Sequence, residues 1–251
     1  MRHRDAVVAL LGEHPLFARL EREVQQRLVE ENPVSYLEAG ELLYRSGGAA
    51  EQIFVLLAGA LQIEYPPPGE ARGIVKAMIT APGLLGEAQV LSGRTWSGTG
   101  VAMFPLTSLA LSRRAFERLM VEHPPVGLEL YQELACRFLN AIDNWKAEQA
   151  LEPSDNLARF LRSYAAVQAR FLDPPGAPPS IPLGQAELGR ATGLSRETIN
   201  RVLRQWAREG RVEIKKSAVL LLDASALAAP GRADDRGLVQ DLRDHLRSAR
   251  T

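Results

Sequence analysis

The sequence predicts an α+β protein with a β-rich N-terminal domain, a long central helix and a C-terminal winged helix–turn–helix domain. Three observations predict this fold. Short apolar runs recur about every ten residues between 34 and 111. An uninterrupted amphipathic segment follows at 125–151, and two short helices with a hairpin are indicated at 185–222. The expected parts are residues 1–124 for the β-rich domain, 125–152 for the central helix, 153–229 for the winged helix–turn–helix domain and 230–251 for a tail.

The composition is typical of a globular protein. The chain has 251 residues, of which 46% are hydrophobic and 24% are charged. No apolar run approaches the roughly 20 residues that a membrane-spanning helix needs. The single cysteine, Cys136, excludes an internal disulfide and an iron–sulfur cluster held by cysteines of this chain. These features predict a cytoplasmic protein without a membrane partner.

The net charge of zero conceals an uneven distribution. Residues 30–99 contain eight acidic and four basic side chains, whereas residues 195–216 contain seven basic and three acidic ones. A basic patch near the end of the chain is consistent with binding to nucleic acid. A solvent-exposed basic helix face is the alternative.

The N-terminal half changes character at Val34. Before it, residues 5–29 carry apolar side chains at helical spacing. After it, apolar runs are separated by glycine, proline and polar residues, a pattern that predicts a small β-sandwich or β-roll. The runs are 42–44, 53–57, 61–65, 74–79, 84–85, 100–103 and 106–111.

The segment 125–151 predicts a helix about 39 Å long. Its apolar surface is too wide for one small sheet to cover, so we expect a partner helix from a second copy of the chain. Packing on its own domain is the alternative. The apolar positions are Leu128, Leu130, Tyr131, Leu134, Ala135, Phe138, Leu139, Ala141, Ile142 and Trp145.

The sequence pattern of residues 153–222 predicts a domain of three helices and a β-hairpin. A helix is expected at 155–171, an irregular proline-rich loop at 173–180, and two helices near 185–192 and 195–209. Gly193 permits a tight turn between the last two helices, and Ser195 is a suitable N-cap. The hairpin that follows would form a wing. A short helix is also predicted in the tail, at 238–246.

The second of these helices carries a polar face suited to base recognition. Arg196, Glu197 and Arg201 fall within one arc that can face a groove. Arginine can donate two hydrogen bonds to guanine, and a carboxylate can accept one from cytosine. The alternative is an exposed helix with a Glu197–Arg201 ion pair. The predicted contacts to double-stranded DNA are Ser195, Arg196, Glu197, Thr198, Asn200, Arg201, Arg204, Lys215 and Lys216.

The chain resembles the cyclic-AMP receptor protein/fumarate–nitrate regulator (Crp/Fnr) superfamily over roughly residues 15–225. The sequence SRETINRVL at 195–203 is similar to the recognition helix of that family. The stretches 39–47, 53–59 and 84–87 are similar to its cyclic-nucleotide-binding β-roll. The resemblance implies a homodimeric transcription regulator that reads a palindrome with TGTGA-like half-sites. RNA polymerase would be a further partner of an activator.

The resemblance also marks a candidate ligand site, at Gly86, Glu87, Arg94, Trp96 and Ser97. In nucleotide-binding members a Gly-Glu pair holds the ribose and phosphate, and an arginine before a serine neutralises the phosphate. Trp96 stands where that arginine is expected, and a tryptophan cannot neutralise a phosphate. On an extended segment, Arg94 would share the face of Trp96 and could replace the missing charge.

The central helix departs from the family pattern as well. Ala141 and Ile142 stand where cyclic-AMP-binding members carry adjacent threonine and serine. Neither side chain can form a hydrogen bond. The two departures predict a regulator that requires no cofactor and is not controlled by cyclic AMP. Control by a cyclic nucleotide or cyclic dinucleotide (cyclic AMP, cyclic GMP or cyclic di-GMP) is the alternative.

Two other classes of protein fit the sequence less well. A nucleotide-binding signalling module that acts on a protein partner would need only the β-roll, and the basic helix and wing argue against it. An enzyme is disfavoured, because the sequence has no phosphate-binding GxxxxGK[ST] loop, no metal-ligand cluster and no Ser–His–acid set.

Overall fold

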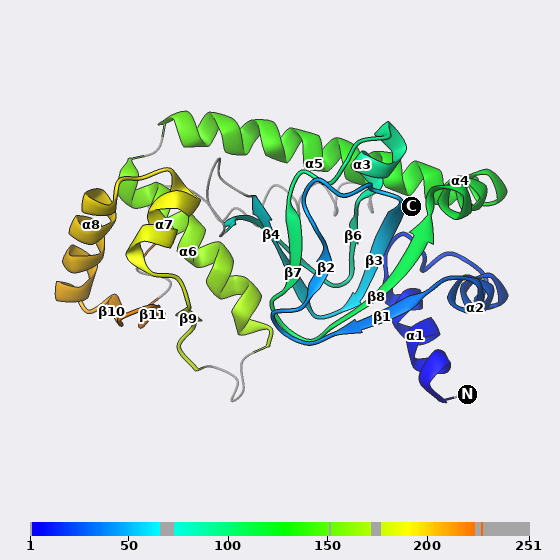
Figure 1. The fold of residues 1–251 in the computed structure, drawn as a ribbon, viewed down its shortest axis with the longest axis horizontal. Helices are drawn as coiled ribbons and strands as arrows, with labels where there is room; N and C mark the ends of the chain where they lie inside the picture. Colours follow the sequence, from blue (N-terminus) through cyan, green and yellow to red (C-terminus); the bar gives the residue numbers. More distant parts are fainter. Residues whose placement is uncertain (1, 66–72, 151, 172–176, 224–226, 228–251) are drawn as a thin grey trace, which may run out of the picture.

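The computed structural model of the protein confirms the predicted α+β fold (Figure 1). A β-rich domain is followed by one long helix and then by a smaller domain with three helices and a small sheet. The structure describes residues 2–65, 73–150, 152–171, 177–223 and 227, without the side chains of 2–3 and 143–150.

The helices and strands occupy the following residues. The helices are α1 (Arg2–Glu13), α2 (Arg22–Glu31), α3 (Glu87–Ser92), α4 (Arg113–Glu122), α5 (Pro124–Ala150), α6 (Pro153–Ala169), α7 (Gln185–Thr192) and α8 (Arg196–Arg208). The strands are β1 (Val34–Leu37), β2 (Leu42–Tyr44), β3 (Gln52–Ala58), β4 (Ala60–Tyr65), β5 (Ile74–Thr80), β6 (Gly83–Leu85), β7 (Thr99–Ala102), β8 (Leu106–Ser112), β9 (Ser180–Ile181), β10 (Val212–Ile214) and β11 (Val219–Leu221).

Two four-stranded antiparallel sheets, ordered β1-β8-β3-β6 and β2-β7-β4-β5, form the β-rich domain. Strand β3 explains why its apolar run is continuous rather than alternating. Ile53, Val55 and Leu57 face one core, while Phe54 and Leu56 face another. Successive side chains of a strand point to opposite faces, so a strand buried on both faces is apolar at every position.

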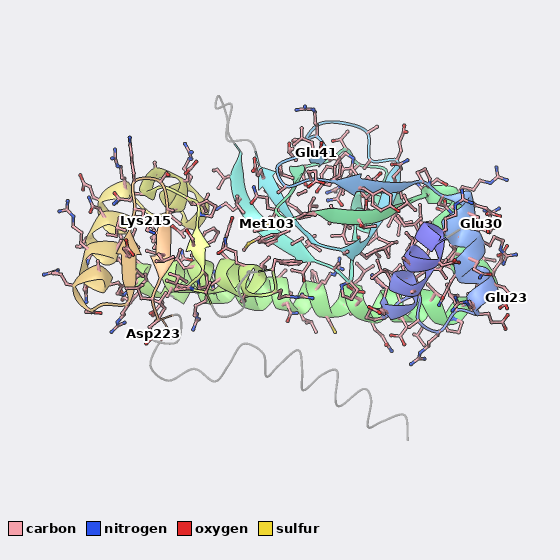
Figure 2. All side chains as sticks on the ribbon, turned by 90° about the horizontal axis from the view of Figure 1, so that it is seen from below. Glu23, Glu30, Glu41, Met103, Lys215 and Asp223 are labelled. Carbon is pink, nitrogen blue, oxygen red and sulfur yellow. The ribbon has the colours of Figure 1, made fainter. Side chains whose placement is uncertain are left out.

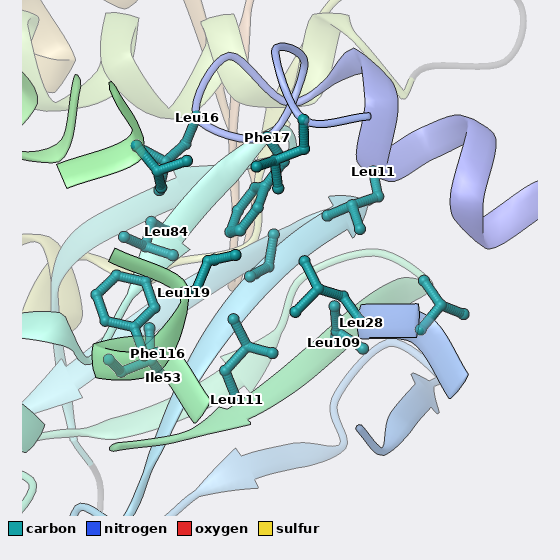
Figure 3. Close-up of a cluster of buried hydrophobic side chains, with 14 of the residues drawn as sticks. Leu11, Leu16, Phe17, Leu28, Ile53, Leu84, Leu109, Leu111, Phe116 and Leu119 are labelled. Atoms are coloured by element: carbon teal, nitrogen blue, oxygen red, sulfur yellow. The ribbon is translucent and has the colours of Figure 1, made fainter. Parts of the chain in front are cut away.

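The first of these cores is covered by helices (Figure 3). Leu11 of α1, Phe17 of the turn after it and Leu28 of α2 pack toward Ile53 and Leu111 on the sheet. Each of these side chains is buried, which contributes roughly 1.5–3 kcal/mol per side chain. The N-terminal helices therefore share one hydrophobic core with the β-rich domain.

Helix α5 runs along the β-rich domain and leads into α6 of the smaller domain (Figures 1 and 2). It begins at Pro124, one residue before the predicted start. Proline is tolerated there because the backbone N–H that it lacks would have no partner in the first turn of a helix. No helix among the described residues is both long and apolar enough to cross a membrane.

The C-terminal domain packs α6, α7 and α8 against the sheet β10-β11-β9. The prediction of an irregular loop through Ser180 is wrong at its end, because Ser180 pairs with Leu220 of β11. Ser180 follows the last proline of the loop, and the next side chain, Ile181, is fully buried in the domain core. The helix predicted at 238–246 and the tail 230–251 lie outside the described residues.

Candidate nucleic-acid interface and sensor site

Helices α7 and α8 form a helix–turn–helix unit. Gly193 ends α7 with a φ of 73°, a left-handed conformation that L-residues with side chains rarely adopt. Ser195 then begins α8, where its Oγ accepts a hydrogen bond from the backbone N–H of Thr198 at 3.1 Å. The hydroxyls of Ser195 and Thr198 also lie 2.9 Å apart. These two predicted DNA contacts therefore organise the start of the helix.

Helix α8 is divided sharply into a buried and an exposed face. Ile199, Val202, Leu203 and Trp206 are buried in the domain core. At about 100° per residue, the remaining positions form an opposite arc that faces solvent. The exposed residues of this arc are Glu197, Arg201, Arg204, Gln205 and Arg208, and Arg196 is exposed beside it as the first residue of the helix. The geometry leaves a continuous polar surface, mostly basic, at the end of the molecule.

The structure brings Arg196, Glu197 and Arg201 together on this surface. Within the described part of the chain, Glu197 and Arg201 form no ion pair, so the alternative of an internally neutralised helix has no support. Asn200 differs from the other predicted contacts. It lies at the border of the exposed arc, half-buried, and its Oδ1 is inaccessible and has no hydrogen-bond partner among the described residues.

Strands β10 and β11 form the wing. Lys215 and Lys216 are exposed in the turn between them, and the Lys215 N–H donates to the Ala218 carbonyl at 2.9 Å. Figure 2 places Lys215 at the opposite end of the molecule from Glu23 and Glu30. The basic turn of the wing and these two carboxylates therefore lie far apart in the molecule.

In the sensor domain, Trp96 fills the space in front of Gly86. The indole ring is only 6% exposed and stacks on Tyr44, with ring centroids 4.0 Å apart. A Cβ atom at Gly86 would lie 2.6 Å from the Trp96 ring, and Gly86 has a φ of +93°. Both the conformation and the close approach require glycine there. Trp96 is thus a packed core residue at the position where the family resemblance expects an arginine.

Glu87 is paired with a residue that the sequence analysis did not identify. Its Oε1 accepts a hydrogen bond from Nη1 of Arg137 on α5 at 2.7 Å, and Nη2 of Arg137 donates to the Leu84 carbonyl at 3.1 Å and to Glu133. Burial raises the pKa of the Glu87 carboxyl, and the guanidinium partly offsets that shift. Arg137 could have been found as the only basic residue of the central helix before Lys146.

The remaining predicted ligand residues lie apart from this cluster. Arg94 and Ser97 are exposed, while Trp96 between them is buried. On α5, Ala141 is exposed and Ile142 is half-buried. Gly86, Glu87 and Trp96 are therefore close together, and Arg94 and Ser97 do not join them. Among the described residues, no group of three or more histidine, cysteine, aspartate or glutamate side chains could hold a metal ion.

Helix α5 separates its apolar residues onto two faces. Val126 and Leu130 are buried against the sensor core. Tyr131 and Phe138 are 71% and 66% exposed, and Leu128 and Leu139 are also exposed. The outer row, spaced as the a and d positions of a heptad, is Leu128, Tyr131, Ala135, Phe138 and Ile142. This row is the face that a second helix could cover.

Comparison with known proteins relates both domains to described families. The model for the cyclic nucleotide-binding domain matches residues 34–123. The model for the Crp-like helix-turn-helix domain matches residues 156–229. Together these matches cover the sensor sheets, α6, the helix–turn–helix unit and the wing.

Three similar proteins show the range of the resemblance. A CRP-like cAMP-activated global transcriptional regulator of Mycobacterium tuberculosis is 21% identical over 77% of this chain and 85% of its own length. The HTH-type transcriptional regulator Cmr of the same species is 24% identical over 84% of this chain and 82% of its own length. The solved structure of the c-di-GMP responsive global regulator CLP of Xanthomonas campestris aligns with a TM-score of 0.61 at 18% identity, covering 80% of this chain and 99% of that one.

Proposed function

Because the chain belongs to the Crp/Fnr superfamily of transcription regulators, we propose that it acts as a homodimer on a palindromic site with TGTGA-like half-sites, without cyclic AMP. The chain is thus a transcription regulator with a cyclic nucleotide-binding domain and a helix–turn–helix domain, and not an enzyme. The finer claims rest on the exposed face of α8, the outer row of apolar residues on α5 and the packing of the sensor core.

The exposed arginine–glutamate–arginine face of α8 is the observation that carries the proposal. Arg196 and Glu197 lie in the first turn of α8 and Arg201 one turn later, all exposed. The first turns of a recognition helix are the part that reaches base edges in the major groove. Arg196 and Arg201 would each donate to a guanine, and Glu197 would accept from a cytosine. The basic side chains that would contact phosphates are Arg204, Arg208, Lys215 and Lys216.

Alanine at Arg196 or Arg201 is expected to lower the affinity for the specific site by about 1–3 kcal/mol each, and to relax the base preference at one position of each half-site. Fluorescence anisotropy with duplexes substituted at each half-site position measures both effects. Arg208→Ala is the matched control, since a phosphate contact would weaken binding to all duplexes about equally. If the Arg196 and Arg201 variants behave like the Arg208 variant, base reading by this face is wrong.

Two copies of the chain would meet along the outer row of α5. Four large apolar side chains of this helix are exposed in the single chain, namely Leu128, Tyr131, Phe138 and Leu139. In a pair of α5 helices related by a twofold axis, each of these side chains would be buried in both copies of the chain. Two recognition helices related by such an axis would read a palindrome, with half-sites about one helical turn apart.

The sensor core supports control without cyclic AMP. Trp96 occupies the position of the expected phosphate-binding arginine and is packed on Tyr44. Glu87, which would hold the ribose in nucleotide-binding members, is already bonded to Arg137 of the same chain. A ligand would have to displace both contacts. Arg94 is exposed, whereas Glu87 and Trp96 are buried.

Cyclic AMP is therefore expected to leave the affinity of the protein for its palindromic site unchanged. Isothermal titration of the apo protein with cyclic AMP, cyclic GMP and cyclic di-GMP, paired with DNA binding in each state, checks this. A large stimulation of DNA binding at micromolar cyclic AMP would contradict it. The relatives include a cAMP-activated and a c-di-GMP responsive regulator, so the other two nucleotides test the alternative of a nucleotide-responsive regulator.

Three further expectations remain predictions. The domain boundaries at 124, 152 and 229 would separate the sensor, the dimerisation helix and the DNA-binding domain. RNA polymerase would be a partner if the regulator activates transcription, and the protein would act in the cytoplasm. A signalling module acting on another protein is the remaining alternative, and binding of a palindromic duplex would argue against it.

A further inference from the structure

The sensor and the DNA-binding domain of one chain meet along β5, the edge strand of the sheet β2-β7-β4-β5. At one end of β5, Nζ of Lys76 donates to the carbonyl oxygens of Ala191 at 2.8 Å and Arg190 at 3.3 Å. These carbonyls lie in the last turn of α7, where helical partners are missing and the helix dipole is negative. Lys76 thus caps the first helix of the helix–turn–helix unit from the other domain.

A second contact is made at the opposite end of β5. Arg170, which ends α6, donates from Nη1 to Oγ1 of Thr80 at 2.7 Å and from Nη2 to the Ala81 carbonyl at 3.0 Å. Beside it, the rings of Phe104 and Phe171 stack with centroids 4.5 Å apart. Lys76 extends from the sensor domain to the DNA-binding domain, and Arg170 extends from the DNA-binding domain to the sensor domain. The junction is therefore held by hydrogen bonds at two separate points.

The space between these two points is apolar. Met78 of β5 and Met103 pack against the buried core of the DNA-binding domain. Figure 2 shows Met103 where the sensor sheet adjoins that domain. The two sets of hydrogen bonds and the apolar contact between them restrict both the rotation of the two domains against each other and their separation. None of these residues belongs to the exposed arc of α8, so the junction supports the reading helix without covering it.

We infer that this junction fixes the direction of α8 relative to α5 and thereby selects the half-site spacing that a dimer accepts. The inference rests on the proposed function, because spacing has meaning only for two copies on one duplex. A duplex presents the same groove face about every 10.5 base pairs. A rigid junction allows both recognition helices to bind only where the spacing matches, whereas a loose one accepts several spacings at lower affinity. Lys76 and Arg170 are positioning residues in this scheme and do not contact DNA.

The test compares the full chain with Lys76→Met and Arg170→Met, singly and together. Each protein is bound at one salt concentration to palindromes whose half-sites are moved apart or together one base pair at a time, and to a duplex with a single half-site. We expect each variant to lose about tenfold in affinity at the best spacing, to flatten the spacing profile, and to keep its affinity for the single half-site. Lys76→Arg retains the cation and should restore part of the preference.

Arg114→Met is the matched control, because it removes the same charge from an exposed position on α4, outside the junction. It should leave the spacing profile unchanged. An equal loss on palindromes and on the single half-site, with an unaltered profile in both junction variants, would overturn the inference. A wild-type protein that binds the palindrome no better than the single half-site would overturn the proposed function as well, and this result appears before any variant is made.

Discussion

Phe138→Asp is expected to convert the proposed dimer into monomers. The Phe138 side chain is 66% exposed in the single chain and belongs to the outer row of α5. An interface with twofold symmetry contains each residue once from each copy, so one substitution removes two buried rings. At roughly 2 kcal/mol per ring, the loss is about 4 kcal/mol, which weakens the dimer roughly a thousandfold. The new carboxylates would also face each other across the axis.

Sedimentation equilibrium measures the dissociation constant directly, and DNA binding reports its consequence. The variant should bind a palindrome about as weakly as a single half-site, since the second half-site no longer benefits from linkage to the first. Leu42→Asp is the control, because Leu42 is an exposed apolar residue of β2 on the sensor sheet. A Phe138→Asp protein that remains dimeric at micromolar concentration would show that the copies meet elsewhere.

Trp96→Ala is expected to destabilise the sensor domain by about 3–5 kcal/mol, the usual cost of removing a large aromatic side chain from a core. The ring is 6% exposed, stacks on Tyr44 at 4.0 Å and lies 6.0 Å from the Phe54 ring. Chemical denaturation followed by circular dichroism, a signal that does not depend on the removed tryptophan, measures the shift of the sensor transition.

Trp96→Phe separates packing from other roles. It keeps an aromatic ring for Tyr44 to stack on and should lose much less stability than alanine. The DNA-binding core is a separate cluster, so both variants should retain base reading by α8 while they are folded. An alanine variant as stable as the wild type would contradict the packing role. It would instead favour Trp96 as part of a ligand site.

Much of the fold could be predicted from local patterns. The continuous apolar run of β3 and the glycine- and proline-marked turns indicate a small β domain, because each run is too short for a helix. The turn at Gly193 and the N-cap at Ser195 bound α8 correctly, since both signals depend on backbone geometry within a few residues. The short strand at Ser180 was missed because its partner lies 40 residues away at Leu220.

The sensor site was harder to predict, for two physical reasons. Arg137 reaches Glu87 across 50 positions of sequence, a contact that no local pattern reveals. Arg94 was expected on the same face as Trp96, because side chains two residues apart share a face in a regular strand. The segment between Gly93 and Gly98 is not one, apart from an isolated bridge at Thr95, so alternation fails there. The faces of α8 were predictable because helical periodicity alone determines them.

Selection of duplexes from a random pool by the wild-type protein, near physiological salt and without nucleotide, tests the central claim most directly. The account predicts that the enriched sequences carry one short motif twice, inverted, with centres about one helical turn apart, and that the Arg196→Ala protein enriches a changed motif. Enrichment of no motif, or of a single motif without an inverted partner, would contradict the reading of DNA by two α8 helices.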